Sequence, residues 1–416
     1  MFMSPADVLL SWFRGILSIC IVIGGVWLIF DWYHSLPETG ERVVIVEDDH
    51  PVRDKNADQR AQNVVTRQRV LSPLERVSRW RPHWNKQSAI LFGGVFLILW
   101  SCGGRYLRPS YLLAKKAERR PKLSTGEVHR LQRPDGTEIH MEISGPPQAT
   151  TVILTHGWSL SREEWAYLQQ DWGDQFRMVV WDLPGLGKSK VSPNRVFTLD
   201  EMARDLHAVI EASGPEPVVL MGHSIGGMTI LTFCQLFPNL LGTRISKLVL
   251  VHTTYMNPLR TMFLSGLVTV LQKPLVEPLL YLQIWLSPLC WIMNCLSYHN
   301  GSIHASVARN GFSGHEPSSE RDFIAGYYLI DSPALLARGT LAMLECDASD
   351  VLRRIKIPVL VIGGEQDPVT SVQASQEIAT DVGAGKLSTF NPAKHFGLLE
   401  YHVEFARQTA EFCSQA

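Results

Sequence analysis

Residues 218–227 read VVLMGHSIGG, an apolar run that ends in the pentapeptide GHSIG at 222–226. A strand that turns sharply into a helix at such a pentapeptide holds the central serine on a strained, exposed turn, where its hydroxyl can attack a carbonyl carbon. Glycines two residues before and after the serine are needed because a Cβ atom there would clash inside the turn. The pattern predicts Ser224 as a nucleophile; the alternative is a structural serine in a tight turn.

A serine hydroxyl at neutral pH needs a base to accept its proton, and the base needs a carboxylate to orient it. Residues 357–363, IPVLVIG, predict a buried strand, which places Asp367 on the loop at its carboxyl end. A shorter strand at 387–390 places His395 on a later loop of the same kind. We therefore expect Asp367 and His395 to complete a triad with Ser224. Nearby carboxylates compete for the role of the acid: Glu365, Asp347 and Asp350.

An oxyanion hole needs backbone N–H groups aimed at the oxygen on which negative charge develops. Residues 151–155, TVILT, predict a strand, and Gly157 after it lets the backbone turn back over the site. We expect the N–H groups of Trp158 and Ile225 to be the donors. The residues that flank this position are expected to shape the site and to contact the substrate: His156, Gly157 and His223.

Five motifs follow one another in the order typical of one family: HGW at 156–158, DLPGLGKS at 182–189, GHSIGG at 222–227, GGEQDP at 363–368 and AKHFG at 393–397. From about residue 125 onward the chain resembles α/β-hydrolase-fold enzymes of the lipase and esterase type. The resemblance implies an α/β fold with a mostly parallel eight-stranded sheet flanked by helices. The epoxide hydrolase and dehalogenase branches carry Asp as the nucleophile, so Ser224 argues against their chemistry.

The coarse pattern of the same region agrees with a parallel sheet. Apolar strands at 151–155, 177–182, 217–222 and 246–252 alternate with helical stretches at 162–171, 199–213 and 226–237. Such alternation is typical of parallel strands joined by crossover helices. After His252 the alternation stops, and we interpret residues 253–332 as a helical cap inserted over the site.

The expected cap is unusually apolar, because residues 262–296 contain only Lys273 and Glu277 as charged residues. It is either an ordinary lid core or a surface for an apolar ligand or a membrane, and Trp285 is a candidate for substrate contact. A third membrane span at 275–296 is not expected. Prolines interrupt that run: Pro274, Pro278 and Pro288.

Two apolar segments precede this domain. Residues 8–30 are uncharged apart from Arg14, and residues 87–104 carry no charge. Both approach the roughly 20 residues that a transmembrane helix needs. The alternatives are a cleaved signal peptide for the first, against which no small-x-small cleavage site is found, and a buried helix for the second. We expect a membrane module at 1–122, with a polar loop at 31–86 and a basic juxtamembrane linker at 105–122, followed by a catalytic domain at 123–416.

The basic residues flanking the spans predict orientation. The stretch 105–122 is strongly basic, whereas the chain after the first span is acidic, so the positive-inside rule places both termini and the catalytic domain in the cytoplasm, with a multi-pass anchor in the cytoplasmic membrane. A basic cluster on the other side of the second span argues for the opposite orientation: Arg76, Arg79, Arg81 and Lys86.

Composition excludes other functions. The formal net charge of −1 gives no electrostatic case for nucleic acid binding, and the seven cysteines lack metal-site spacing. We therefore expect a membrane-anchored serine hydrolase that cleaves carboxylic esters of lipids or other hydrophobic acyl compounds, with membrane lipids as partners and no metal or other cofactor. The alternatives are a thioesterase or C–C hydrolase with a soluble substrate, or a catalytically silent membrane scaffold.

Overall fold

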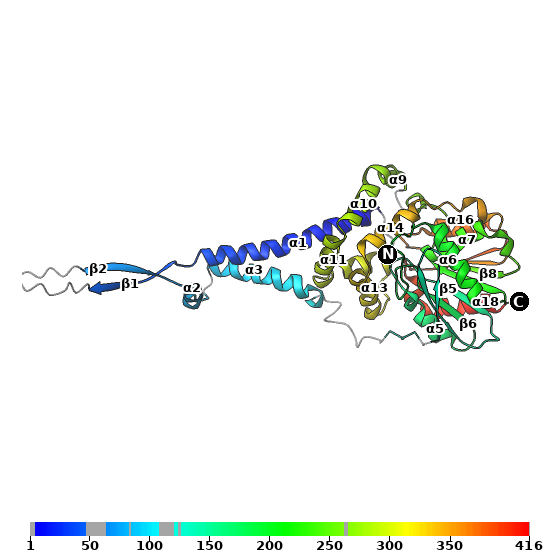
Figure 1. The fold of residues 1–416 in the computed structure, drawn as a ribbon, viewed down its shortest axis with the longest axis horizontal. Helices are drawn as coiled ribbons and strands as arrows, with labels where there is room; N and C mark the ends of the chain where they lie inside the picture. Colours follow the sequence, from blue (N-terminus) through cyan, green and yellow to red (C-terminus); the bar gives the residue numbers. More distant parts are fainter. Residues whose placement is uncertain are drawn as a thin grey trace, which may run out of the picture. The chain divides into compact units, whose positions relative to one another are not determined.

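The computed structural model describes residues 5–46, 64–82, 85–107, 120–123, 126–261 and 265–415 (Figure 1). The chain forms two compact units. One comprises Ile19–Cys102 and is called here the α1–α3 unit. The other combines Met1–Ser18 with Gly103–Ala416 and is called the sheet unit. Its first segment lies within the predicted membrane module, so the predicted division at residue 122 does not coincide with the compact units.

The sheet unit contains one eight-stranded sheet with the strand order β10-β9-β8-β7-β5-β6-β4-β3. β3 and β4 form an antiparallel hairpin, β4 also pairs antiparallel with β6, and the other neighbours are parallel. The predicted alternation is confirmed, with strand ends within a residue or two of those expected. The strands are β3 (Glu127–Gln132), β4 (Glu138–Ser144), β5 (Thr151–Thr155), β6 (Arg177–Trp181), β7 (Val218–His223), β8 (Ile245–Val251), β9 (Val359–Gly364) and β10 (Gly385–Phe390).

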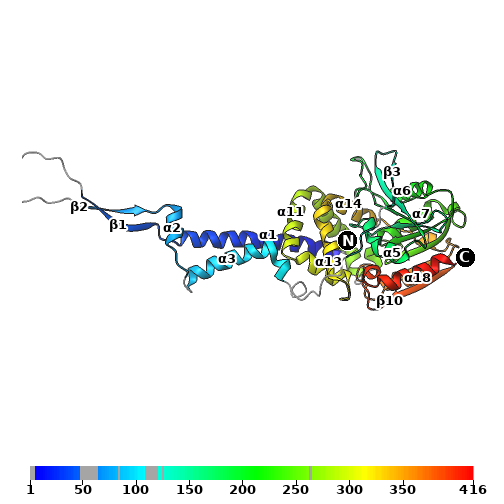
Figure 2. The same ribbon diagram turned by 90° about the horizontal axis from the view of Figure 1, so that it is seen from below.

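Helices cover both faces of this sheet, because successive side chains of a buried strand point to opposite sides. On one side Ile153 and Leu220 pack in a core with α6 (Leu199–Ala212), α7 (Ile225–Leu236) and α16 (Val372–Asp381) (Figures 1 and 2). On the other, Leu154 and Met221 pack with α5 (Ala166–Trp172) and α18 (His402–Ser414). Short helical turns add to both layers: η2 (Arg162–Trp165) and α17 (Gly397–Glu400) pack on the side of α5 and α18, and η3 (Pro238–Leu240) packs on the side of α6 and α7.

The chain between β8 and β9 is mostly helical in its described part, and the interpretation of residues 253–332 as a cap over the site stays a prediction. The predicted end at residue 332 falls between two helices, α13 and α14, so the helical insertion runs further than expected. We call α8 to α14 the cap helices. They are α8 (Pro258–Thr261), α9 (Ser265–Leu271), η4 (Gln272–Val276), α10 (Glu277–Trp285), α11 (Ser287–His299), α12 (Ser302–Gly311), α13 (Ser318–Ile330) and α14 (Pro333–Leu344); α15 (Ser349–Leu352) then precedes β9.

The beginning of α1 (Pro5–His34) packs against the cap helices. The hydroxyl of Ser18 lies 3.0 Å from that of Ser297 and accepts a hydrogen bond of 2.8 Å from the side-chain amide of Asn300. The guanidinium of Arg14 lies 5.6 Å from the ring centre of Tyr328. Since these partners come from α11, its C-terminal cap and α13, the start of the first apolar helix is part of the sheet unit.

Within the α1–α3 unit, the rest of α1 packs against α3 (Lys86–Gly103), which η1 (Gly104–Leu107) follows in the chain. The two helices approach closely at a glycine pair: a Cβ atom on Gly94 would lie 2.8 Å from the carbonyl oxygen of Gly25. Small residues that allow backbones to approach are typical of paired membrane helices. Leu10–His34 and Lys86–Tyr106 are long and apolar enough to cross a membrane, whereas α9 to α11 meet that criterion only as a pair bent by 95°.

The predicted polar loop between the spans contains regular structure. β1 (Thr39–Val46) and β2 (Val64–Val70) form an antiparallel pair, and α2 (Pro73–Arg79) follows. The helix starts with a capping box between Ser72 and Glu75. The charged residues of this segment predicted a loop, but its β-branched runs favour strands. The interval from 47 to 63 lies outside the described residues.

Replacing Ser18 by Ala should weaken the packing of α1 on the cap. The change removes the acceptor of the Asn300 amide and leaves a buried donor without its partner, at a cost of about 1–3 kcal/mol in the free energy of unfolding. Thermal unfolding in detergent measures the effect. Ser101→Ala is the matched control, because the buried Ser101 hydroxyl donates to Leu97 O within its own helix. Equal stabilities of the two variants would contradict the assignment.

Candidate active site

The turn after β7 has the geometry that its sequence predicts. Ser224 has φ 53° and ψ −118°, and α7 starts at the next residue. A Cβ atom on Gly222 would lie 2.4 Å from the carbonyl carbon of Gly226, and one on Gly226 would lie 2.3 Å from Thr155 O. Both glycines are therefore required. The Ser224 side chain is buried, although the turn was expected to expose it, because the surrounding chain covers the turn.

The three predicted triad residues come together. His395 Nε2 lies 3.1 Å from Ser224 Oγ, and His395 Nδ1 lies 2.9 Å from Asp367 Oδ2. Ser224 follows β7, Asp367 follows β9 and His395 follows β10, so all three lie at the carboxyl-terminal edge of the sheet. All three are buried, and both distances lie within hydrogen-bond range. The arrangement provides a nucleophile, a base and a carboxylate that orients the base.

Five hydrogen bonds hold the carboxylate of Asp367. Oδ1 accepts from the N–H groups of Val369 (2.8 Å) and Thr370 (3.0 Å), and Oδ2 accepts from the Thr370 hydroxyl (2.9 Å) and from two histidine rings. Burial alone would raise the pKa of Asp367, but the His395 charge and the histidine hydrogen bonds outweigh burial and hold that pKa well below its usual range. Asp367 is therefore an anion at neutral pH.

Burial lowers the pKa of His395, whereas burial by itself raises the pKa of the Asp367 carboxyl. Loss of water around the imidazolium lowers the pKa of His395 below its ordinary value of 6.5, and the Asp367 carboxylate only partly offsets this. The imidazole is therefore neutral at neutral pH. With Nδ1–H donated to Asp367, Nε2 is left as the acceptor that faces the Ser224 hydroxyl.

The predicted oxyanion donors follow adjacent strands, because β5 and β7 are parallel neighbours with Thr155 opposite Gly222. The loop after β5 is fixed by Gly157 N–H, which donates to Glu164 Oε2 at 2.9 Å. Ile225 is the first residue of α7, a position whose N–H has no carbonyl partner within the helix. The assignment of Trp158 and Ile225 N–H as donors stays a prediction that this placement favours.

Comparison with known proteins agrees with this geometry. Residues 150–271 match the family described as "alpha/beta hydrolase fold". A bifunctional esterase/perhydrolase of Acinetobacter calcoaceticus is 25% identical over 272 residues, which cover 63% of this chain and 90% of the relative. A non-heme chloroperoxidase of Burkholderia pyrrocinia is 26% identical over 287 residues, which cover 65% of this chain and 93% of that relative. A thermophilic esterase structure from Thermogutta terrifontis aligns with a TM-score of 0.56 at 21% identity over 69% of this chain and 98% of that chain.

These matches support membership of the α/β-hydrolase superfamily for the sheet unit of this chain.

Within the sheet unit, a second histidine contacts Asp367 and was not singled out from the sequence. His252 Nδ1 lies 3.2 Å from Asp367 Oδ2, and the ring is fully buried. Its backbone has φ 42°, an uncommon value for a residue with a side chain, and its N–H donates to Ile362 O at 2.7 Å. One signal for this contact was available: His252 directly follows β8, β8 pairs with β9, and the loop after β9 carries Asp367.

Burial lowers the pKa of His252, against the opposing pull of Asp367, so the ring is neutral and donates Nδ1–H to the carboxylate. Asp367 is consequently held between two imidazoles. His252 does not touch the Ser224 hydroxyl directly in this arrangement; it positions the acid that orients His395.

Two other predicted site residues hold the backbone around the triad. His156 Nδ1–H donates to Gly157 O at 2.8 Å, and its Nε2 accepts from Leu183 N–H at 2.9 Å. His223 Nε2–H donates to His395 O at 3.1 Å, and its Nδ1 lies 2.6 Å from a Glu164 oxygen. Both rings are fully buried with their nitrogens directed at protein groups. This placement favours shaping of the site over direct contact with a substrate.

Trp285 and the competing acids lie elsewhere. Trp285 ends α10 with 80% of its surface exposed, so it does not line an enclosed substrate pocket. Glu365 accepts from the Thr389 hydroxyl at 3.3 Å, and Asp347 accepts from Ser349. Asp350 lies in the first turn of α15. Asp367 is thus the carboxylate that the structure brings to His395.

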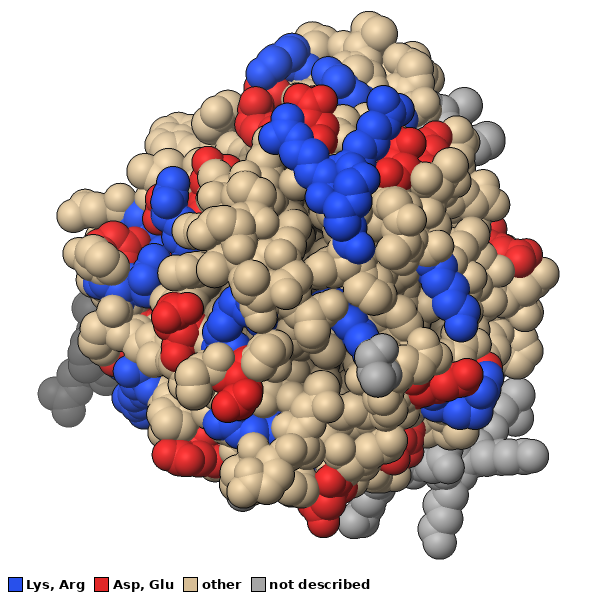
Figure 3. Space-filling model, turned by 90° about the vertical axis from the view of Figure 1, so that its right-hand side faces the viewer, with Lys and Arg blue, Asp and Glu red and all other residues tan. Residues whose placement is uncertain are grey.

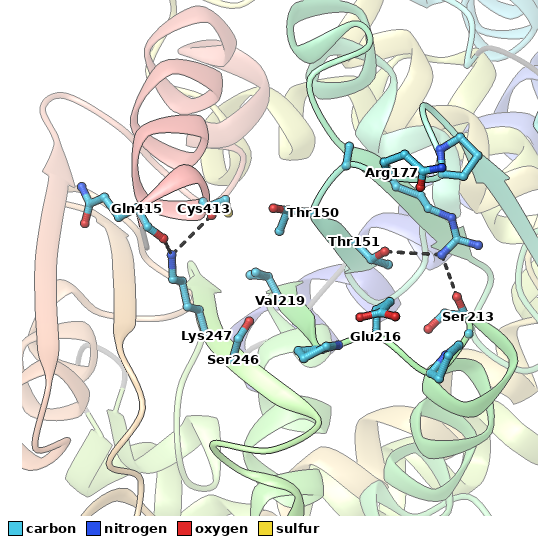
Figure 4. Close-up of a pocket in the computed structure, with 16 residues that line it drawn as sticks. Thr150, Thr151, Arg177, Ser213, Glu216, Val219, Ser246, Lys247, Cys413 and Gln415 are labelled. Carbon is cyan, nitrogen blue, oxygen red and sulfur yellow. Dashed lines mark hydrogen bonds between the residues drawn. The ribbon is translucent and has the colours of Figure 1, made fainter.

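A cavity of about 640 Å³ lies at the opposite edge of the sheet, where β5, β7 and β8 begin (Figure 4). Its cations are engaged: the Lys247 ammonium donates to the carbonyl oxygens of Phe412 and Cys413 at the end of α18, and Arg177 donates to Ser213 O at 2.6 Å. Ligands of open α/β sheets bind at the carboxyl ends of the strands. This cavity is therefore not the candidate active site.

The acid limb of the pH–rate profile should report His395. Because burial lowers its pKa, the neutral base persists below pH 6.5, and we expect kcat/KM for ester hydrolysis to fall through a single protonation with a midpoint below 6.5. Asp367→Asn removes the charge that raises this pKa, so the midpoint should move lower still while the rate drops by about 10⁴-fold. A wild-type midpoint above 6.5 would contradict the lowered pKa of His395.

His252→Phe should raise the midpoint of the same acid limb and lower kcat by about tenfold with little change in KM. The variant removes the Nδ1–H donor to Asp367, which leaves the carboxylate better able to stabilise the His395 imidazolium and so raises the pKa of His395. His252→Asn is the matched control, because its side-chain amide can donate from a position close to that of Nδ1 and should restore the wild-type profile. Equal profiles for all three proteins would remove the positioning role from His252.

Proposed function

We propose that the protein is a membrane-anchored serine hydrolase that cleaves carboxylic esters, with lipids or other hydrophobic acyl compounds as substrates. The observation that carries the proposal is the continuous hydrogen-bonded series Ser224 Oγ, His395 and Asp367, with separations of 3.1 and 2.9 Å. The fold and the esterase relatives support it as well.

In the proposed reaction, His395 Nε2 takes the Ser224 proton as Oγ bonds to the ester carbonyl carbon. The carbonyl oxygen becomes an oxyanion, which the N–H groups of Trp158 and Ile225 stabilise. Collapse of this intermediate breaks the ester C–O bond, and His395 gives its proton to the departing alcohol. Water, deprotonated by His395, then attacks the acyl-serine, and the carboxylic acid is released as His395 returns the proton to Ser224 Oγ.

The anchor in the proposal consists of α1 and α3, the two helices with the length and apolar character of membrane spans. The basic stretch after α3 is proposed to keep the sheet unit on the cytoplasmic side. Of that stretch, Arg108, Lys115, Lys116 and Arg119 lie outside the described residues. Arg120 is held by the sheet unit, since its guanidinium pairs with Glu320 and lies 3.5 Å from the ring centre of Phe323.

A fluorophosphonate probe tests the nucleophile. The wild-type protein in detergent should be labelled covalently, and Ser224→Ala should lose all labelling, because only an activated serine reacts with the phosphorus centre. Ser246→Ala is the matched control: this serine lies at the amino-terminal edge of the sheet, where its hydroxyl donates to Val218 O. Absence of labelling in folded wild-type protein would favour a silent scaffold, and labelling of Ser224→Ala would reject the assigned nucleophile.

A series of p-nitrophenyl esters tests the substrate class. We expect kcat/KM to rise with acyl length from acetate toward decanoate, because each buried methylene contributes about 0.8 kcal/mol of transfer free energy. Measurements below the micelle concentration of each ester keep the comparison free of aggregation. A preference for acetate would reject hydrophobic acyl compounds and leave an esterase for small substrates.

A further inference from the structure

We propose that the cap helices α10 and α11 are inserted in the lipid leaflet next to the sheet unit, so that the enzyme takes its ester from that leaflet. The membrane part of this inference rests on the packing of α1 and the cap. The statement about the ester rests on the proposed function. The first observation is an apolar surface, called here the cap patch, made of Tyr281, Leu282, Trp285, Leu289, Trp291 and Ile292.

The cap patch belongs to helices that are apolar on both sides. α11 buries Cys290, Met293 and Ser297 against the protein, and its opposite side exposes Ile292 with 48% of its surface accessible. α10 likewise buries Leu280 and exposes Tyr281. Between Glu277 and His299 the chain contains no Asp, Glu, Lys or Arg. Helices that are apolar all round belong in a protein core or in a membrane, and in the described part of the chain no core packs against the outer side of this pair.

The start of α1 identifies the occupant of this surface as lipid. The candidate span Leu10–His34 begins within the segment that packs on the cap. A Cβ atom on Gly15 would lie 2.8 Å from Met293 Cβ, so α1 and α11 are in direct contact there. Without its first nine residues the span would measure only about 24 Å, at roughly 1.5 Å per residue, against a hydrocarbon thickness of about 30 Å. The part of α1 that contacts α11 is therefore needed at membrane depth.

The polar groups of this part of α1 are directed at the cap. Arg14 is buried beside the ring of Tyr328, whereas its apolar neighbours Phe13 and Leu17 are exposed. The Ser18 hydroxyl is likewise satisfied by Ser297 and Asn300. Charged and polar side chains within a membrane face protein and not lipid. The cap thus shelters the groups that α1 would otherwise expose to hydrocarbon.

The opposite end of the sheet unit has the surface of a water-exposed protein. On that face Lys and Arg side chains are interspersed with Asp and Glu (Figure 3). Charge is thus abundant there, whereas α10 and α11 carry no Asp, Glu, Lys or Arg after Glu277, and the cap patch borders charged residues beside Tyr281, at Lys273 and Glu277. This contrast supports one leaflet-facing end of the sheet unit, formed by α10, α11 and the start of α1.

The helices that are proposed to lie in the leaflet adjoin the loop that carries Trp158. A narrow internal space of about 30 Å³ lies among Trp12 of α1, Met293 of α11 and Leu336 of α14. Leu336 O accepts a hydrogen bond of 3.1 Å from the indole N–H of Trp158, the proposed oxyanion residue. The cap helices that contact α1 are thus joined through α14 to the loop that carries Trp158.

Photo-crosslinking of the full-length protein in phosphatidylcholine nanodiscs tests the insertion. The photoreactive residue p-benzoylphenylalanine is placed at Tyr281 or Ile292, with Val26 of α1 as the lipid-facing reference and Val403 of α18, 66% exposed, as the aqueous reference. We expect lipid adducts by intact mass at 281, 292 and 26, and none at 403. Adducts at 26 but not at 281 or 292 would overturn the insertion. No adduct at 26 would overturn it too, because α1 would then lie outside the bilayer.

Kinetics separate this inference from the proposed function. Ile292→Glu should lower hydrolysis of a long-chain ester embedded in vesicles at least tenfold and leave turnover of soluble p-nitrophenyl acetate unchanged, whereas Val403→Glu should change neither. Equal vesicle rates for Ile292→Glu and wild type would overturn delivery from the leaflet. Absence of turnover of both esters by the wild type would overturn the hydrolase proposal instead, and crosslinking, which needs no catalysis, would still decide the insertion.

Discussion

The buried carboxylate of Asp367 is the group on which the site depends. An anion without water is costly unless hydrogen bonds surround it, and here its own loop supplies three while the loops after β8 and β10 supply one each through His252 and His395. The carboxylate therefore fixes the relative positions of three loops. Burial of the same groups lowers the pKa of His395 and keeps the base neutral. Burial of these hydrogen-bonded groups therefore both fixes the loops and keeps His395 neutral.

Local sequence patterns predicted the parts of the site that depend on local geometry. The glycines around Ser224 are required by contacts within one turn, so the pentapeptide sufficed, and Asp367 and His395 follow apolar strands whose shared edge brings them together. His252 was missed because its role depends on β8 and β9 being neighbours, which no local pattern of that loop encodes. The packing of Ser18 on Ser297 was missed for the same reason: an apolar run predicts a span but not the surface that it contacts.

The oxyanion loop and the cap are built as one structure. Trp158 donates its indole N–H to α14, and a Cβ atom on Gly339 of that helix would lie 1.9 Å from the indole ring, so helix and ring are in the closest contact that a glycine permits. Any displacement of α14 must therefore move Trp158 or break this contact, because packed interiors deform little. The position of the cap and the position of a proposed oxyanion donor are mechanically linked.

The hydrogen bond between His252 and Asp367 has a second consequence, which follows from the order of the chain. The helical insertion leaves the sheet directly after β8, where His252 lies, and returns through β9, whose following loop carries Asp367. The contact thus joins the start of the insertion to the loop after β9, at the carboxyl-terminal edge of the sheet, while α11 of the insertion packs on α1. The insertion is therefore held at two places, by the contact of His252 with Asp367 at its start and by the packing of α11 on α1. Because packed interiors deform little, a displacement of its first residues would disturb the carboxylate that contacts His395.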